Sequence, residues 1–199
     1  MRDKQLIISV GREFGSAGHV IAEKLADYFN LPLYNKNFLK EVLEDKGIDN
    51  SEIHKYDEEH KRFGVYRSVR GMDSAPETII ANMQFDYMRK KAESGESFVV
   101  VGRCSETVLK ECPALVSIFV LGDKKEKLNR IVIKHNLSLE EAEKLRREKD
   151  EKRKKYHNHY CEGKWGDSRN YDISINSSKL GIDETTRILI DYIESRERV

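Results

Sequence analysis

The sequence predicts an α/β fold in which a parallel sheet carries helices on both faces. Short apolar runs, typical of buried strands, alternate along the chain with longer amphipathic segments. The opening shows the pattern: residues 6–10 are apolar, small residues follow at 15–18, and 20–29 have helical periodicity. Because parallel strands carry ligands at their carboxyl ends, we expect the residues that follow the strands to form one site.

The remaining elements are predicted from periodicity, capping residues and glycine or proline breaks. Residues 30–34 are expected to be a turn into a short strand. Further strands are expected at 98–101, 115–121 and 171–175, and helices at 36–45, 77–94, 124–135, 138–160 and from 183 onward. A short helix is expected up to about residue 110. Residues 48–75 have little periodicity, and we interpret 36–75 as a flexible segment on the acceptor side, where Arg62, Arg67 and Arg70 could close over an anion.

The composition favours one domain over residues 1–199. The hydrophobic fraction is 38%, the charged fraction is 36%, and the formal net charge of +1 indicates no general attraction to nucleic acid or to an acidic membrane. The three cysteines form no C-x-x-C pair, which argues against a disulfide framework and a zinc site and favours a reducing, cytoplasmic location. We expect no signal region and no membrane-spanning segment, since no apolar run is long enough.

The stretch from strand through small-residue loop to helix is a geometry that binds phosphate. Small residues let the backbone curl, so that N–H groups and the positive end of the helix face one anion. The alternative is an ordinary tight turn, because the stretch lacks the P-loop string Gly-x-x-x-x-Gly-Lys-Ser/Thr, and no lysine occurs before Lys24. Gly11, Gly102 and Asn176 follow three of the predicted strands and are expected to converge on this site.

The helix expected from Ser138 is strongly basic. Ser138 and Glu141 form a capping-box pattern, and residues 144–155 contain eight cations against three anions. A run of charge is usually a solvated helix face, but this one, in a nearly neutral chain, also suits a polyanionic ligand. Its weak apolar stripe suggests that residues 138–163 form a lid that closes over the ligand.

Three motifs in order resemble the cytidylate kinase-like family of P-loop nucleoside monophosphate kinases. The motifs are Ser9-Val-Gly-Arg-Glu-Phe-Gly-Ser-Ala-Gly-His19, Val101-Gly-Arg-Cys104, and Lys164-Trp-Gly-Asp167 continuing through Asn170-Tyr-Asp172 to Ile175-Asn-Ser-Ser178. The resemblance runs along nearly the whole chain and implies a five-stranded parallel sheet with a helical lid. True cytidylate kinases have G-S-G-K-G-T at 15–20, so Gly18 stands at their lysine and Val20 at their threonine. Their G-R-D motif has Cys104 in place of the acid.

The resemblance also implies roles for individual residues. Phosphate contacts and catalysis would fall to Arg12, Arg146 and Arg153. ATP would be held by Gly11, Gly15, Ser16, Ala17, Gly18, His19, Asn176 and Ser177. Acceptor binding would fall to Arg103, Asp150 and Arg153, with Asp150 on the ribose. Ser16 would bind Mg²⁺, with Glu13 or Asp123 as candidates for a carboxylate ligand.

The implied activity is transfer of the ATP γ-phosphate, with Mg²⁺, to a nucleoside monophosphate such as CMP or dCMP. Because the P-loop lysine is absent, a nucleotide-binding regulator without catalysis is the alternative. Nucleic-acid binding is a weaker third reading, since aromatic residues are not interleaved with the basic ones. Cys104 is interpreted as a packing residue, and His157 and His159 as surface residues, because no third metal ligand is evident.

Overall fold

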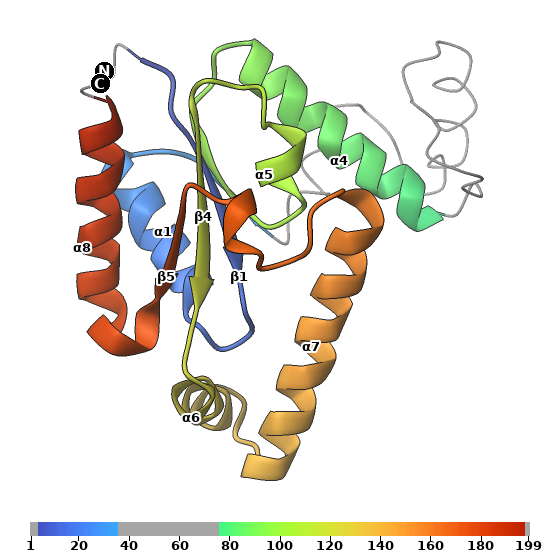
Figure 1. The fold of residues 1–199 in the computed structure, drawn as a ribbon, viewed down its shortest axis with the longest axis vertical. Coiled ribbons are helices and arrows are strands. Elements are labelled where there is room, and N and C mark those ends of the chain that lie inside the picture. Colours follow the sequence, from blue (N-terminus) through green and yellow to red (C-terminus); the bar gives the residue numbers. More distant parts are fainter. Residues whose placement is uncertain (1–3, 36–75, 198–199) are drawn as a thin grey trace.

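The first strand along the chain is the middle strand of a parallel sheet (Figure 1). The structure is a computed structural model that describes residues 4–35 and 76–197. The strand order is β2-β3-β1-β4-β5. Their bounds are β1 (Ile7–Arg12), β2 (Leu33–Tyr34), β3 (Phe98–Val101), β4 (Leu115–Leu121) and β5 (Ile173–Asn176). Ile8 pairs with Val99 on one side and with Val116 on the other.

Helices cover both faces of the sheet, and alternate residues of β1 divide between them. Ile8 and Val10 belong to a buried apolar cluster with α1 (Gly18–Phe29) and α8 (Ser177–Glu197). Ile7 belongs to a second cluster with α4 (Pro76–Glu93) and α5 (Ser105–Val108). Figure 1 shows these two helix pairs on opposite sides. The predicted five-stranded α/β fold is therefore confirmed.

Two charged helices extend past the carboxyl ends of the strands. They are α6 (Lys124–His135) and α7 (Leu139–Tyr160), and a 3₁₀ turn, η2 (Ser168–Asn170), leads from them into β5. Ser138 caps α7 with the predicted capping box: its hydroxyl accepts from the Glu141 N–H, and the Glu141 carboxylate accepts from the Ser138 N–H. A small apolar cluster around Ile131 and Ala142 joins α6 to α7.

Some predicted boundaries were wrong. Gly11 does not end the first strand, because Gly11 and Arg12 continue the pairing with Phe119 and Val120 of β4. The range of α8 joins a short helical segment that begins at Ser177 to the predicted last helix, across a break at Gly181, which has φ 78°. The expected helix at 36–45 and the segment 48–75 lie outside the described residues. Within the described residues, no helix is long and apolar enough to cross a membrane.

Candidate functional site

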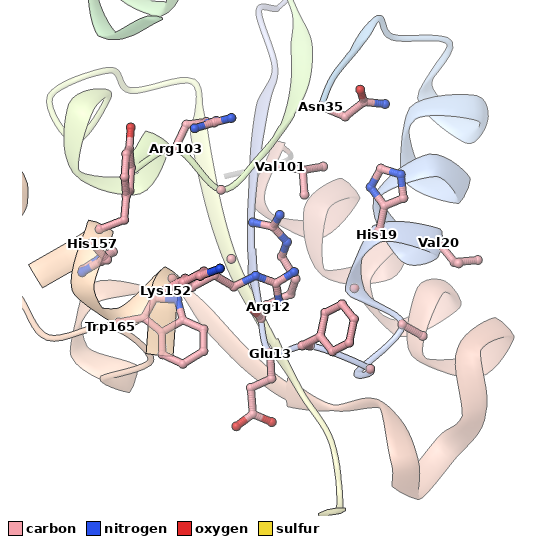
Figure 2. Close-up of a pocket in the computed structure, with 18 of the residues that line it drawn as sticks. Arg12, Glu13, His19, Val20, Asn35, Val101, Arg103, Lys152, His157 and Trp165 are labelled. Carbon is pink, nitrogen blue, oxygen red and sulfur yellow. Dashed lines mark hydrogen bonds between the residues drawn. The ribbon is translucent and has the colours of Figure 1, made fainter. Parts of the chain in front are cut away.

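A cavity of about 660 Å³ opens at the carboxyl ends of the central strands. This volume is in the range of small-molecule sites. The loop after β1 forms one wall, the loop after β3 a second, and the inner face of α7 a third (Figure 2). Trp165 lies on the wall and meets the ring of Phe119 edge-on at 5.6 Å between centroids. The predicted convergence is thus found for the segments around Gly11 and Gly102.

The loop after β1 needs two left-handed backbone positions. Gly15 has φ 83°, and a side chain there would meet the Lys127 carbonyl oxygen at 2.8 Å from its Cβ. Ala17 has φ 63° and immediately precedes α1. A left-handed conformation is uncommon for a residue with a Cβ, so the surrounding structure must hold it in place. The loop therefore curls towards the amino end of α1, as phosphate binding requires.

Hydrogen bonds from three helices hold this loop. The Phe14 N–H donates to the Asp150 carboxylate of α7 at 2.7 Å, and Arg130 of α6 donates to the Gly15 carbonyl at 3.2 Å. The Ser177 hydroxyl, at the start of α8, donates to the Ser16 carbonyl at 2.6 Å. Sequence reasoning missed Arg130, which lines the cavity between two apolar positions of its helix.

Glu13 anchors the loop from the side facing away from Arg12 (Figure 2). Its carboxylate accepts from the Lys127 ammonium at 2.7 Å and from the Gly122 N–H at 3.0 Å. Lys127 is only 5% exposed, so its ammonium group is removed from water, whereas the Glu13 side chain is 27% exposed. Removing one partner of such a pair leaves a buried charge uncompensated, which makes the pair a fixed part of the loop.

Three residues predicted to hold the nucleotide are engaged in hydrogen bonds within the protein. Ser16 is fully buried, and its hydroxyl donates to the Glu13 carbonyl at 2.9 Å. The Asn176 amide donates to Asp123 at 2.8 Å, and Ser177 reaches the Ser16 carbonyl. None of the three lines the cavity, whereas Gly11, Gly15, Ala17, Gly18 and His19 do. The nucleotide contacts and the Mg²⁺ role of Ser16 stay predictions.

Arginines from three separate elements meet in the cavity: Arg12 ends β1, Arg103 follows β3, and Arg153 lies on α7. Arg12 reaches across to Gly102, where any side chain would collide with its guanidinium. Burial, and to a smaller extent the neighbouring charges of Arg153 and Arg103, lower the pKa of Arg12 to about 9. Burial and mutual repulsion disfavour charged guanidinium groups that lie this close together. Such a group of arginines is typical of a site that binds an anion.

Two of these arginines have contacts that set their positions. The Arg153 guanidinium donates to the Arg12 carbonyl at 3.1 Å and lies over the ring of Phe14, 5.5 Å from its centroid. Arg103 lies 5.8 Å from the centroid of the Tyr156 ring, and its own backbone is left-handed, with φ 61°. Strained backbone of this kind occurs at ligand-binding loops.

Arg12 occupies the space that a side chain at position 18 would need. A Cβ added to Gly18 would lie 2.5 Å from the Arg12 Cβ and 3.2 Å from the Val120 Cβ. A side chain at position 18, a lysine included, is therefore incompatible with this backbone as long as position 12 carries a Cβ.

The predicted lid residues divide into two groups. Arg153 faces the cavity, but the Arg146 guanidinium binds the Glu143 carboxylate through two hydrogen bonds of 3.0 Å and lies 3.5 Å from Asp150. Hydrogen bonding to Glu143 accordingly raises the pKa of Arg146. Burial raises the pKa of Asp150, an effect that its hydrogen bond from Phe14 opposes. Asp150 thus connects α7 to the phosphate loop, and opening of α7 stays a prediction.

The prediction that His157 is a surface residue was wrong. His157 is 5% exposed, and its Nε2 lies 2.7 Å from a Glu106 carboxylate oxygen. It faces α5 because the end of α7 packs onto the apolar cluster of α4 and α5, a contact that the charged sequence of α7 does not reveal. The only signal in the sequence is the spacing of four residues between His157 and Cys161, which places both on the same face of a helix.

A parallel sheet of this order, with a small-residue loop after its central strand, is the fold of P-loop kinases. Shikimate kinase from Bacteroides thetaiotaomicron shares the fold at 12% identity with a TM-score of 0.53, covering 95% of this chain and 98% of its own. Residues 7–179 match the cytidylate kinase-like family, and the chain belongs to that family.

Two relatives illustrate the range of similarity. An uncharacterized protein from Eubacterium ventriosum is 41% identical with a TM-score of 0.77, covering 96% of this chain and 99% of its own. A cytidylate kinase from Pyrobaculum islandicum is 24% identical over 189 residues, which is 94% of this chain and 92% of that protein. The family resemblance predicted from three motifs is confirmed.

Proposed function

We propose that the protein transfers the γ-phosphate of ATP to a nucleoside monophosphate, with CMP or dCMP as the first candidate acceptors. The observation that carries the proposal is the meeting of Arg12, Arg103 and Arg153 in a cavity beside a phosphate-binding loop. Phosphoryl transfer depends mainly on positioning and on positive charge around the transferred group, and this cavity supplies both. Membership of the cytidylate kinase-like family supports the choice of acceptor.

Each arginine has a place in this proposal. Backbone N–H groups of residues 15–19 and the start of α1 bind the ATP phosphates, and Arg12 takes the part of the missing lysine on the γ-phosphate. Arg153 reaches the transferred group from α7, and Arg103 binds the acceptor phosphate. Asp150 is proposed as a positioning residue for the loop, since contact with a ribose would require it to leave the Phe14 N–H.

Mg²⁺ does not fit a protein site among the described residues. The carboxylates lining the cavity are Glu13 and Glu106, and each is engaged, with Lys127 and with His157. The Ser16 hydroxyl is buried and directed to the Glu13 carbonyl. Mg²⁺ commonly keeps its waters and binds substrate phosphates, so we expect it to arrive with ATP. No role of a protein residue proposed here depends on it.

A second candidate function is a nucleotide-binding regulator without turnover. It is favoured by Gly18 at the lysine position, and by the hydrogen bond that Asp150 makes to the Phe14 N–H, a group that could otherwise face phosphate. Histidine at position 19 is only partly charged at neutral pH and is a weak replacement for lysine.

One experiment separates the two candidates. The purified chain is incubated with ATP, Mg²⁺ and a panel of nucleoside monophosphates, products are separated by chromatography, and ATP binding is measured by calorimetry. Turnover of CMP or dCMP supports the kinase. ATP binding without turnover of any acceptor supports the regulator, and absence of binding by either nucleotide contradicts both.

A further inference from the structure

A buried polar cluster lies where the end of α7 meets α5. Glu106 belongs to α5, and His157 and Cys161 are one helical turn apart at the end of α7. These residues are 5%, 5% and 8% exposed. One potential ligand atom of each lies within 4.8 Å of the other two. Proposed phosphoryl transfer makes no use of the cluster, so its polar groups require another explanation.

The histidine of this cluster has a free nitrogen. Its Nε2 lies 2.7 Å from a Glu106 carboxylate oxygen. In the tautomer with the proton on Nε2, the imidazole donates a hydrogen bond to this carboxylate. Its Nδ1 is then a lone-pair acceptor, and it is buried without a hydrogen-bond partner. A carboxylate on one nitrogen and a free lone pair on the other is how proteins orient a metal-binding histidine.

Two thiols complete the surroundings of the imidazole. The Cys161 thiol interacts with His157 and with the thiol of Cys104, which is 3% exposed. The donors come as two closely spaced pairs, Cys104-x-Glu106 and His157-x₃-Cys161, from two different elements. Thiolates and imidazoles are the usual ligands of zinc in proteins, at about 2.0–2.3 Å.

We propose that this cluster binds one thiophilic metal ion, with Zn²⁺ as the first candidate. His157 and Cys161 are its ligands, Cys104 supplies the second thiolate, and Glu106 holds the imidazole. The thiol protons leave to solvent on binding. Such an ion would tie the end of α7 to the residue next to Arg103, and so fix the base of α7 against the loop after β3. The alternative is a cluster held by hydrogen bonds alone.

Cobalt absorption tests the site without nucleotide. The full chain is stripped with a chelator under reducing conditions and titrated with Co²⁺, which gives a thiolate-to-cobalt charge-transfer band when bound by cysteine. We expect one equivalent of Co²⁺ to bind and Zn²⁺ to displace it. Cys112→Ser is the matched control, because Cys112 is the other cysteine of the chain and stands outside the cluster. Its band should match that of the unmodified chain.

Variants at the ligands should weaken binding. We expect Cys161→Ser to lower Co²⁺ and Zn²⁺ affinity at least tenfold, and Glu106→Gln to lower it roughly 10- to 100-fold through the imidazole. Because Cys104 can still supply one thiolate, a weaker band is compatible with the assignment, whereas a band and a Co²⁺ affinity that are both unchanged in Cys161→Ser would overturn it. Circular dichroism compares the folding of each variant with that of the control.

The unmodified chain provides a test that no folding defect can obscure. Zn²⁺ that binds the folded state raises the thermal unfolding temperature, and a chromophoric chelator reports its affinity by competition. If Zn²⁺ shifts neither unfolding nor the chelator signal, and Co²⁺ gives no band, the cluster is held by hydrogen bonds alone. Because these measurements contain no nucleotide, their failure would leave the kinase proposal standing.

Discussion

The loops that follow β1 and β3 occupy equivalent places at the ends of neighbouring strands, yet they are supported in different ways. Each contains left-handed residues and each brings one arginine to the cavity. The first loop is hydrogen-bonded by α6, α7 and α8. In the second, the Ser105 hydroxyl donates to the Gly102 carbonyl at 2.8 Å and lies 2.6 Å from that of Ser9.

The difference indicates how each loop can function. The first is organised before any ligand arrives, and the position of its arginine is set by β1 itself. The second presents Arg103 from a strained backbone, with the Tyr156 ring of α7 beside it. We therefore expect the first loop to govern the rate of phosphoryl transfer, and the second to govern acceptor binding in a way that depends on α7.

The largest effect should come from Arg12. Arg12→Ala removes the charge proposed to replace the P-loop lysine, and loss of one transition-state contact typically costs about 100- to 1,000-fold in kcat. Steady-state kinetics with ATP and the best acceptor measures it. Arg187→Ala, at an exposed ion pair on α8, is the control and should behave as the unmodified chain. A variant at position 12 that keeps more than a tenth of kcat contradicts the assignment.

Arg103→Ala should act on the acceptor. Loss of a charge-assisted hydrogen bond costs about 1.5–3 kcal/mol, which corresponds to roughly 10- to 150-fold weaker acceptor binding. Calorimetry with each nucleotide separately should show the loss for the monophosphate and little change for ATP. An equal loss of affinity for both nucleotides would mean that the loop after β3 does not act on the acceptor alone.

The steric exclusion between Arg12 and position 18 can be measured as a coupling. Gly18→Ala places a Cβ against that of Arg12, and overpacking of this kind costs about 1–3 kcal/mol of unfolding free energy. In an Arg12→Gly background the same change should cost less, because the opposing Cβ is gone. Denaturant unfolding of the four proteins gives the double-mutant cycle. Strict additivity would show that the two positions do not compete.

Asp150→Asn tests the support of the first loop. The neutral amide accepts the Phe14 N–H more weakly than the carboxylate does, so amide exchange at residues 13–17 should rise by about tenfold. Exchange at residues 102–105 should stay unchanged. Hydrogen exchange measured by mass spectrometry compares both segments in one sample. Unchanged exchange in the first loop would show that Asp150 does not stabilise it.

The smallest expected effect is a gain in stability. The pKa of Arg12 is lowered to about 9, so the folded protein holds this proton less tightly than the unfolded chain does. The charge therefore destabilises the ligand-free fold at every pH below about 9. Arg12→Met should raise the unfolding free energy at pH 7 by about 1 kcal/mol without phosphate, as measured in urea. A loss of stability would mean that the guanidinium is already compensated.

Much of the fold could be predicted from the sequence, because apolar runs and helical periodicity are local signals. The strands, their parallel sheet and the capping box at Ser138 all have such signals. The extension of β1 through Gly11 has none, since it depends on pairing with Phe119 of β4. The short helical segment at the start of α8 has none either, and it is held by the hydrogen bond from Ser177 to the loop after β1.

The site was predictable only in part. Three arginines named from the family motifs, Arg12, Arg103 and Arg153, line the cavity. In contrast, Arg146 turns to Glu143 and Ser16 turns inward. A small hydroxyl or an arginine has the same appearance in a sequence whether it binds a ligand or braces a loop. Cysteines expected to be unrelated prove to be neighbours, because the contact of α7 with α5 is a property of the folded chain.

The position of β1 at the centre of the sheet has a consequence for synthesis on the ribosome. The strand is made first, but both of its neighbours come later, and Leu6 meets Ser97 across 91 residues of chain. Because synthesis adds about 5–20 residues per second, β1 remains without a paired strand for several seconds. We expect the nascent chain to bind chaperones during that interval, and the sheet to close only once β4 has emerged.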